Sequence, residues 1–339
     1  MKKWLIVGVT ILGMVCCSGT LAKVGVFIPG LLLFCYICSR TTRLSAEQYR
    51  EGFYNKVVLL CGASSGIGEE LAYQLASKHC QLVLVARTEA KLLRVKEGAL
   101  KAGSPRVEVI SYDFSNVKKC VSTVLYKTIE LYGRLDYLIL NHGLMPNGPF
   151  LGFPKQQDPE FIQKIYNVNV FSYIQLATHA IPHLELTGGH IHVTSSMAGE
   201  IPQIIGGLYC ATKHSKNGFF YSLQQELIHK RSKVSLNIGA FGLIVTREMK
   251  DVIMKKMNMP KFLQGDLKRC VQVILDNLVR RERTITFPPT NIAFRFNWYL
   301  NPFFHEFFLA GITDYNSLVK NHTTIHEQSA KTGYQKGSS

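Results

Sequence analysis

Short apolar runs alternate with helical patterns through most of this 339-residue chain, and this alternation limits the possible folds more than any other feature. Each run is brief, rich in β-branched residues and bounded by turn or helix signals, which is typical of a buried strand. Repeated alternation predicts a doubly wound, mostly parallel α/β sheet of the Rossmann type, with helices on both faces. The predicted strands are 56–61, 81–85, 106–112, 136–140, 190–194 and 233–238.

The amino-terminal segment has a different composition. Between residues 4 and 38 only Lys23 carries a charge near neutral pH. A straight helix of that length would extend about 50 Å, beyond a hydrocarbon core of about 30 Å. We therefore expect a membrane anchor in residues 1–40, either a single span with the rest at the interface or a hairpin. A cleaved signal peptide is the alternative, since two lysines precede the apolar run.

The membrane we expect is the endoplasmic reticulum, and the basic residues on both sides of the apolar run leave the orientation open. The sequon at Asn321 would be glycosylated only in a secretory lumen, so its modification would distinguish a lumenal from a cytosolic catalytic domain.

The remainder divides into four expected segments. A polar linker at 41–55 precedes one catalytic domain at 56–283. Residues 284–320 are dense in aromatic side chains and could form a dimer face, a pocket cover or an interfacial helix, which we favour for a tethered chain. Residues 321–339 are polar and expected to be disordered.

Charge and cysteine content bear on the possible partners. Lys and Arg outnumber Asp and Glu by 39 to 23, and the excess lies in scattered short clusters. This distribution suits an anionic membrane surface or solubility better than a nucleic-acid groove, so no nucleic acid is expected. The nine cysteines show no paired zinc spacing, so no metal site is expected.

A glycine-rich turn links the first predicted strand to the first helix. Its residues are Gly62, Ser64, Ser65, Gly66, Ile67 and Gly68. Glycines permit a tight turn and a close approach of the backbone to a pyrophosphate, and the helix N-terminus supplies oriented amides. Its position directly after the first strand makes this a predicted dinucleotide site.

The end of the second strand indicates which dinucleotide. An NAD site places a carboxylate there, whereas this chain has Arg87, which can neutralise a 2′-phosphate. NADP(H) is therefore the expected cofactor. Asp113 and Phe114, just past the third strand, are assigned to the adenine end, and Asn141 ends the fourth strand at the edge where ligands bind.

Four polar residues form the predicted catalytic group. Tyr209 and Lys213, four residues apart on a helix, share one face, so the ammonium can lie beside the phenol. A free phenol has a pKa of about 10, and a nearby cation favours the phenolate needed for proton exchange. Ser196 can hydrogen-bond the substrate oxygen, and Asn169 can hold a water for proton return.

These residues carry a resemblance to a known family. The stretches that it rests on are 62–68, 138–142, 169–170, 195–199, 209–213 and 242–246. They resemble the short-chain dehydrogenase/reductase family, most closely the membrane-bound group around 11β-hydroxysteroid dehydrogenase type 1. The resemblance implies that Asn169, Ser196, Tyr209 and Lys213 are the catalytic tetrad and that Ile244 and Thr246 contact the nicotinamide. Tyr209 and Lys213 would also contact the cofactor.

The chain also departs from the family pattern. Cys61 stands where a threonine is usual before the first glycine, and His142 belongs to a changed Asn-Asn-Ala-Gly motif. Gln203 stands where the steroid enzyme has an aromatic residue, which weakens the case for a glucocorticoid.

Together these features predict an NADP-dependent oxidoreductase that interconverts a ketone and a secondary alcohol on a lipophilic substrate. Ser196 and Tyr209 would contact that substrate, and a methionine-rich segment at 247–267 would cover it. A steroid, a retinoid-like alcohol or a lipid ketone would fit, and a non-catalytic NADP-binding scaffold is the rival. The expected partners are membrane lipid and a second copy of the chain in a homodimer.

Overall fold

The computed structural model describes residues 44–146, 154–203, 206–247, 264–292 and 295. The chain divides into two compact units, Met1–Gln48 and Tyr49–Ser339. In the first unit the Gln48 amide donates to Ser45 Oγ at 3.2 Å, and the Ser45 amide donates to Gln48 Oε1 at 2.8 Å. This reciprocal capping arrangement starts helix α3 (Ala46–Phe53) in the segment predicted to be a linker.

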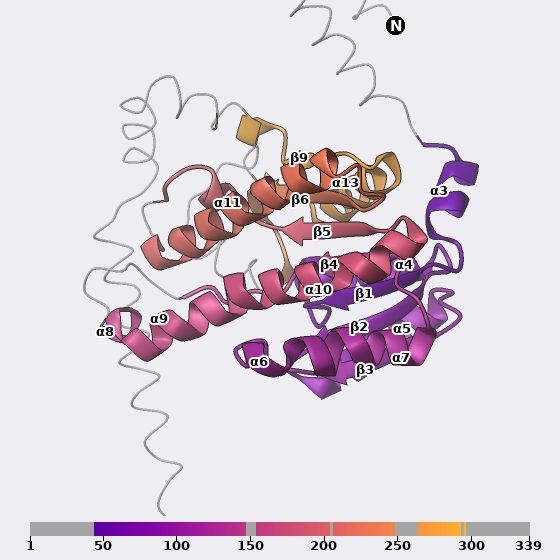
Figure 1. Ribbon diagram of the computed structural model, residues 1–339, viewed down its shortest axis with the longest axis horizontal. Coiled ribbons are helices and arrows are strands. Elements are labelled where there is room, and N and C mark those ends of the chain that lie inside the picture. Colours follow the sequence, from indigo (N-terminus) through magenta and orange to yellow (C-terminus); the bar gives the residue numbers. More distant parts are fainter. Residues whose placement is uncertain (1–43, 147–153, 204–205, 248–263, 293–294, 296–339) are drawn as a thin grey trace, which may run out of the picture. The chain divides into compact units, whose positions relative to one another are not determined.

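Seven parallel strands form one sheet in the described part of the second unit, in the order β3-β2-β1-β4-β5-β6-β9 (Figure 1). The strands are β1 (Val57–Cys61), β2 (Gln81–Ala86), β3 (Val107–Ser111), β4 (Tyr137–Leu140), β5 (His190–Thr194), β6 (Ser235–Phe241) and β9 (Thr284–Phe287). Every residue of β1 and β5 is buried, as expected for strands covered on both faces. The predicted doubly wound α/β sheet is confirmed.

The seventh strand extends the sheet beyond the predicted catalytic domain. β9 lies in the segment 284–320 that was assigned to the aromatic extension, and it pairs with β6 through Ile285 opposite Gly239 and Phe287 opposite Phe241. Ile285 and Phe287 are buried in the core, so the first aromatic residue of that segment belongs to the sheet. The sheet also reaches further along β6, which ends at Phe241 and not at residue 238 as predicted.

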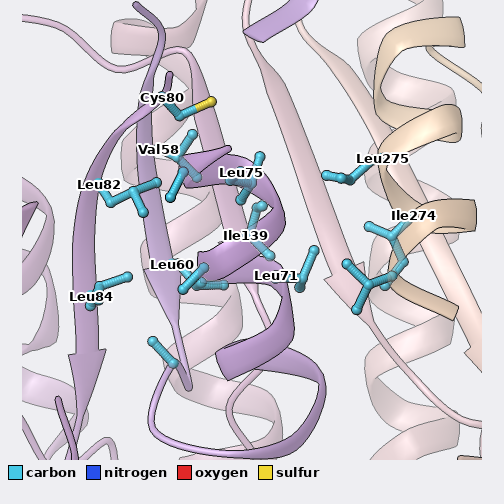
Figure 2. Close-up of a cluster of buried hydrophobic side chains, with 14 of the residues drawn as sticks. Val58, Leu60, Leu71, Leu75, Cys80, Leu82, Leu84, Ile139, Ile274 and Leu275 are labelled. Atoms are coloured by element: carbon cyan, nitrogen blue, oxygen red, sulfur yellow. The ribbon is translucent and has the colours of Figure 1, made fainter. Parts of the chain in front are cut away.

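One face of the sheet is covered by α4 (Gly66–Ala76), α5 (Glu89–Lys101) and α13 (Leu267–Arg280). Figure 2 shows Leu71 and Leu75 of α4 in the same cluster as Val58 and Leu60 of β1. Each fully buried leucine contributes about 1.5–3 kcal/mol to folding. This cluster therefore fixes α4 against β1 and, with them, the turn that joins the two elements.

The opposite face is covered mainly by α10 (Ser172–Thr187) and α11 (Gly207–His229) (Figure 1). Tyr173 of α10 and Phe220 of α11 are fully buried against this side of the sheet. The other helical segments of the second unit that the structure describes are α6 (Val117–Cys120), the π-helical η1 (Val121–Tyr126), α7 (Lys127–Tyr132), α8 (Pro154–Gln157), α9 (Pro159–Tyr166), the π-helical η2 (Asn167–Phe171) and the 3₁₀ turn η3 (Met197–Gly199). A two-stranded sheet joins β7 (Leu243–Ile244) to β8 (Gln264–Gly265).

Several predictions concern residues outside the described ranges. These are the anchor at 1–40, most of the aromatic segment, the tail at 321–339 and most of the methionine-rich cover. Within the ranges that the structure describes, no helix combines the length and the apolar character needed to cross a bilayer.

Candidate functional site

The predicted site residues gather where the strand order reverses. From β1 the chain builds outward through β2 and β3, and then returns to place β4 on the other side of β1. Ligands of such sheets bind beyond the carboxyl ends of the strands at this point. The glycine-rich turn follows β1 there, and Asn141 follows β4.

Two glycines of the turn occupy positions that other residues could not. Gly62 has a φ of +88°, and a Cβ on it would lie 2.6 Å from the backbone nitrogen of His142. A Cβ on Gly68 would lie 1.9 Å from the Gly62 carbonyl oxygen, which Asn141 Nδ2 also contacts at 3.1 Å. The turn is therefore packed directly against the end of β4. This backbone cradle fits the pyrophosphate of a dinucleotide.

The start of α4 presents backbone amides beside this turn. Ser65 precedes the helix with extended backbone and makes no side-chain cap hydrogen bond. The first amides of a helix without such a cap can donate to an anion. Thr246 lies against the same turn, since a Cβ on Gly66 would lie 3.2 Å from its methyl carbon, and Ile244 is buried close by in the sequence.

Arg87 and Asp113 lie at the carboxyl ends of β2 and β3. The Arg87 side chain is exposed, and its carbonyl accepts from Ser111 Oγ at 3.0 Å. Partial burial raises the pKa of Asp113, but the hydrogen bonds from Ser115 and the charges of Arg87 and Lys164 outweigh it and lower the pKa below its ordinary value. The positive charge of Arg87 thus acts on the Asp113 carboxylate at the predicted adenine end.

Phe114 behaves differently from the other predicted cofactor residues. Its side chain is 3% exposed, and its ring stacks on His142 with a centroid distance of 3.7 Å and an interplanar angle of 16°. The ring belongs to the core. Any contact between Phe114 and a cofactor would therefore be made by its backbone atoms.

Helix α11 presents Tyr209 and Lys213 together. Lys213 Nζ lies 5.1 Å from the centroid of the Tyr209 ring. The Lys213 side chain is almost fully buried, whereas Tyr209 is partly exposed. An ammonium with little access to water interacts more strongly with a phenolate, because the local dielectric is low. The Lys213 ammonium therefore lies beside the Tyr209 ring, as the four-residue spacing predicts.

The loop that carries Ser196 is locked onto the same helix. Ser195 Oγ donates to Asn217 Oδ1 at 2.6 Å, and Asn217 Nδ2 donates to the Gly199 carbonyl at 3.0 Å. A Cβ on Gly199 would lie 2.9 Å from the Lys213 carbonyl oxygen. This packing brings the loop after β5 against the Lys213 turn of α11. Ser196 is partly exposed, and its Oγ accepts from the Ala198 amide at 3.1 Å.

Asn169 lies in the π-helical segment η2 and is fully buried. Its Oδ1 accepts from the Leu144 amide at 2.7 Å, while Nδ2 donates to the Leu144 carbonyl at 2.8 Å and to Thr212 Oγ1 at 3.1 Å. Both amide protons are thus used, and Oδ1 keeps one acceptor position. Asn169 ties the loop after β4 to α11 beside Lys213, so any water that it binds must donate to Oδ1 or contact its backbone.

Sequence reasoning missed several residues of this region. Lys216 is fully buried three residues beyond Lys213, and Glu200 is buried on the loop after β5. Asn217 Nδ2 donates to Glu200 Oε1 at 3.2 Å, and Arg295 Nε lies 3.3 Å from Glu200 Oε2. A lysine or a glutamate within a polar stretch carries no signal of burial. Only the placement of the helix reveals these residues.

A cavity of about 520 Å³ lies at the opposite, amino-terminal edge of the sheet. Gln224, Ser235 and Arg281 are among the residues that line it, and none of the predicted catalytic residues does. This cavity is therefore separate from the predicted catalytic residues.

A parallel, doubly wound sheet with a glycine cradle at its reversal point defines a dinucleotide-binding domain of the Rossmann type. The family model described as short chain dehydrogenase matches residues 56–257. The chain therefore belongs to the short-chain dehydrogenase family.

Several vertebrate proteins that are similar in sequence to this chain share one name. A hydroxysteroid 11-beta-dehydrogenase 1-like protein from Danio rerio is 37% identical over 68% of this chain and 80% of its own length. One of the same name from Gallus gallus is 40% identical over 56% of this chain and 64% of its own length, slightly less than two thirds.

Two solved structures share the fold. One is a short-chain dehydrogenase/reductase from Burkholderia phymatum in complex with NAD, with a TM-score of 0.63 and 21% identity, covering 73% of this chain and 94% of its own. The other is L-sorbose reductase from Gluconobacter frateurii complexed with NADPH and L-sorbose, with a TM-score of 0.62 and 20% identity over 69% of this chain and 95% of its own.

Proposed function

We propose that this chain is an NADP(H)-dependent oxidoreductase that interconverts a ketone and a secondary alcohol on a lipophilic substrate. The observation that carries the proposal is the position of the Lys213 ammonium, 5.1 Å from the Tyr209 ring on α11. Family membership and the glycine cradle at the end of β1 support the same conclusion. A protein that only bound a dinucleotide would have no need of this pair.

Each of the four polar residues takes a separate role in this proposal. Tyr209 gives a proton to the substrate oxygen during reduction and removes it during oxidation. Lys213 stabilises the phenolate form of that side chain. Ser196 donates a hydrogen bond to the substrate oxygen and orients it. Asn169 holds the wall of the site together through Leu144 and Thr212.

When bound, a nicotinamide cofactor supplies or accepts the hydride. The residues proposed to hold it are those of the glycine turn, with Asn141 beside them. Ile244 and Thr246 are proposed for its nicotinamide end.

The choice of NADP(H) over NAD(H) is proposed from Arg87. The two solved structures of this fold were determined with NAD and with NADPH, so the fold alone does not decide the cofactor. Arg87 is exposed at the end of β2, and its charge acts on Asp113. A guanidinium there can bind a 2′-phosphate, which NAD(H) lacks.

Replacing Arg87 by Ala should therefore weaken NADPH binding selectively. Loss of the hydrogen-bonded charge pair between the guanidinium and the 2′-phosphate should raise the Kd for NADPH on the order of tenfold to hundredfold. The Kd for NADH should change little, since NADH has no phosphate at that position. Fluorescence titration of the two cofactors measures both constants. Arg283→Ala is the matched control, because it removes an exposed arginine near the amino-terminal edge of the sheet. Equal losses for both cofactors would contradict the assignment.

The lipophilic substrate is proposed from the names of the relatives and from two exposed apolar side chains that neighbour site residues in the sequence. The relatives are named after hydroxysteroid dehydrogenation. Met145, on the loop after β4, is 57% exposed, and Phe171 at the end of η2 is 41% exposed. Apolar side chains at these positions could contact a lipophilic substrate. A panel of steroid, retinoid and long-chain ketones and alcohols, run with both cofactors, tests the proposal; no turnover of any would favour the scaffold alternative.

Membrane tethering by residues 1–40 and a homodimer are also proposed, from composition and from the resemblance respectively. Removal of residues 1–40 should move the protein from the membrane pellet to the supernatant in carbonate-washed fractions. A protein that stays in the pellet would contradict the tether as the main attachment.

A further inference from the structure

Lys216 is a lysine with no exposed surface. Its Nζ donates to the Thr194 carbonyl oxygen at 2.8 Å and lies 4.0 Å from the centroid of the Tyr173 ring. Burying an ammonium is costly unless a carboxylate compensates it. In the described part of the chain no carboxylate forms an ion pair with Lys216, so its charged form has little support.

The other titratable groups around Lys216 in the described ranges are a lysine, two histidines and a tyrosine, and none of them supplies a negative charge. Lys213 precedes Lys216 by three residues, a spacing that puts both on one helix face. Burial lowers the pKa of Lys216 well below its ordinary value, and the charge and hydrogen bond of Lys213 lower it further. Burial also lowers the pKa values of His142 after β4 and of His192 on β5. Tyr173 of α10 has its pKa raised by burial.

We propose that Lys216 is a neutral amine that accepts a hydrogen bond from the Lys213 ammonium and so positions that ammonium beside Tyr209. The amine nitrogen has one lone pair to accept with, while its own protons reach the Thr194 carbonyl and the face of the Tyr173 ring. Lys216 is thus a positioning residue, acting through Lys213. The inference rests on the proposed function of the same site.

A neutral acceptor explains the arrangement better than a second ammonium would. Two ammonium groups at three-residue spacing would repel each other and turn Lys213 away from its partner. An apolar side chain would avoid that repulsion, but it would leave the buried Lys213 ammonium without an acceptor on this side. Lys216 also anchors α11 to the end of β5 through Thr194.

Substitution of Lys216 separates the role of an acceptor from that of a space-filling chain. Lys216→Met keeps the length and removes the acceptor, so kcat should fall about tenfold, the size of one hydrogen bond to a charged group. Lys216→Gln keeps a neutral acceptor and a donor, so its kcat should lie closer to that of the unmodified protein. The Kd for NADPH should change less than kcat in both. Lys230→Met, at the exposed end of α11, is the control.

The pH dependence gives a second readout. As the pH falls, the unmodified protein gains a proton on Lys216, the two ammonium groups repel each other, and kcat should fall. Lys216→Gln should lack this acid-side step. Thermal unfolding and cofactor titration confirm that each variant is folded. A folded Lys216→Met with unchanged kcat and an unchanged pH profile would overturn the inference, and so would a Lys216→Gln variant no better than Lys216→Met.

A measurement that needs no turnover separates this inference from the proposed function. Nitrogen-15 NMR of the lysine side chains, assigned with Lys216→Met, reports whether the Lys216 amine is neutral at pH 7. A neutral amine in a protein without turnover would refute the proposed function alone. A fully charged Lys216 in an active enzyme would overturn the inference alone.

Discussion

Tyr209→Phe is expected to lower kcat by about a thousandfold, within the range of about 10²–10⁴ that positioned acid–base groups contribute. The phenylalanine ring keeps its contact with the Lys213 ammonium, whose Nζ lies 5.1 Å from the ring centroid, but it has no proton to give. Binding of NADPH and the unfolding temperature should stay nearly unchanged. Single-turnover kinetics with the best ketone of the panel, together with cofactor titration, measure these effects.

Tyr126→Phe is the matched control for this prediction. Tyr126 is 48% exposed at the end of η1, so the loss of its hydroxyl should leave kcat and stability unchanged. If Tyr209→Phe keeps more than about a tenth of the activity while Tyr126→Phe keeps all of it, another group transfers the proton.

Gly68→Ala is expected to damage both stability and cofactor binding. The added Cβ would lie 1.9 Å from the Gly62 carbonyl oxygen, so the turn and α4 must move apart. Overpacking of this kind costs about 1–3 kcal/mol of unfolding free energy. The displaced turn should also lower kcat/KM by about a hundredfold, since a shift of about 1 Å near a reacting group can have that effect. Urea unfolding and steady-state kinetics check the two parts.

Gly218→Ala provides the comparison. Gly218 lies within α11 and a Cβ on it would meet nothing within 4 Å, so alanine should stabilise the helix by up to about 1 kcal/mol. Were Gly68→Ala to bind NADPH as tightly as Gly218→Ala, the cradle between β1 and α4 could not be the pyrophosphate site.

The strands illustrate what local patterns can predict. The run 190–194 reads as a buried strand from its own residues, and β5 (His190–Thr194) coincides with it. β9 could not be recognised in the same way. Its residues Thr284–Phe287 form a short run before many other aromatic residues, and only pairing with β6 makes them a strand. Strand identity there depends on a partner far away in the sequence.

The site residues also differ in how far local patterns could predict them. Lys213 was predicted beside Tyr209 because four residues on a helix make slightly more than one turn, which is a local property. The same spacing rules could not show that Lys216 would be buried against Thr194 and Tyr173. That depends on which face of α11 packs on the sheet, and α11 is polar enough to leave the choice open.

Residue patterns alone predict the strand–helix order, the glycine turn at its first junction and the helical spacing of Tyr209 and Lys213. These are short-range properties, set by backbone sterics and by side-chain period. Packing between distant segments, in contrast, makes β9 the last strand of the sheet and fixes the Ser196 loop on α11 through Asn217. The same packing buries Lys216 three residues after Lys213, since burial and long-range hydrogen bonds arise only when distant segments come together.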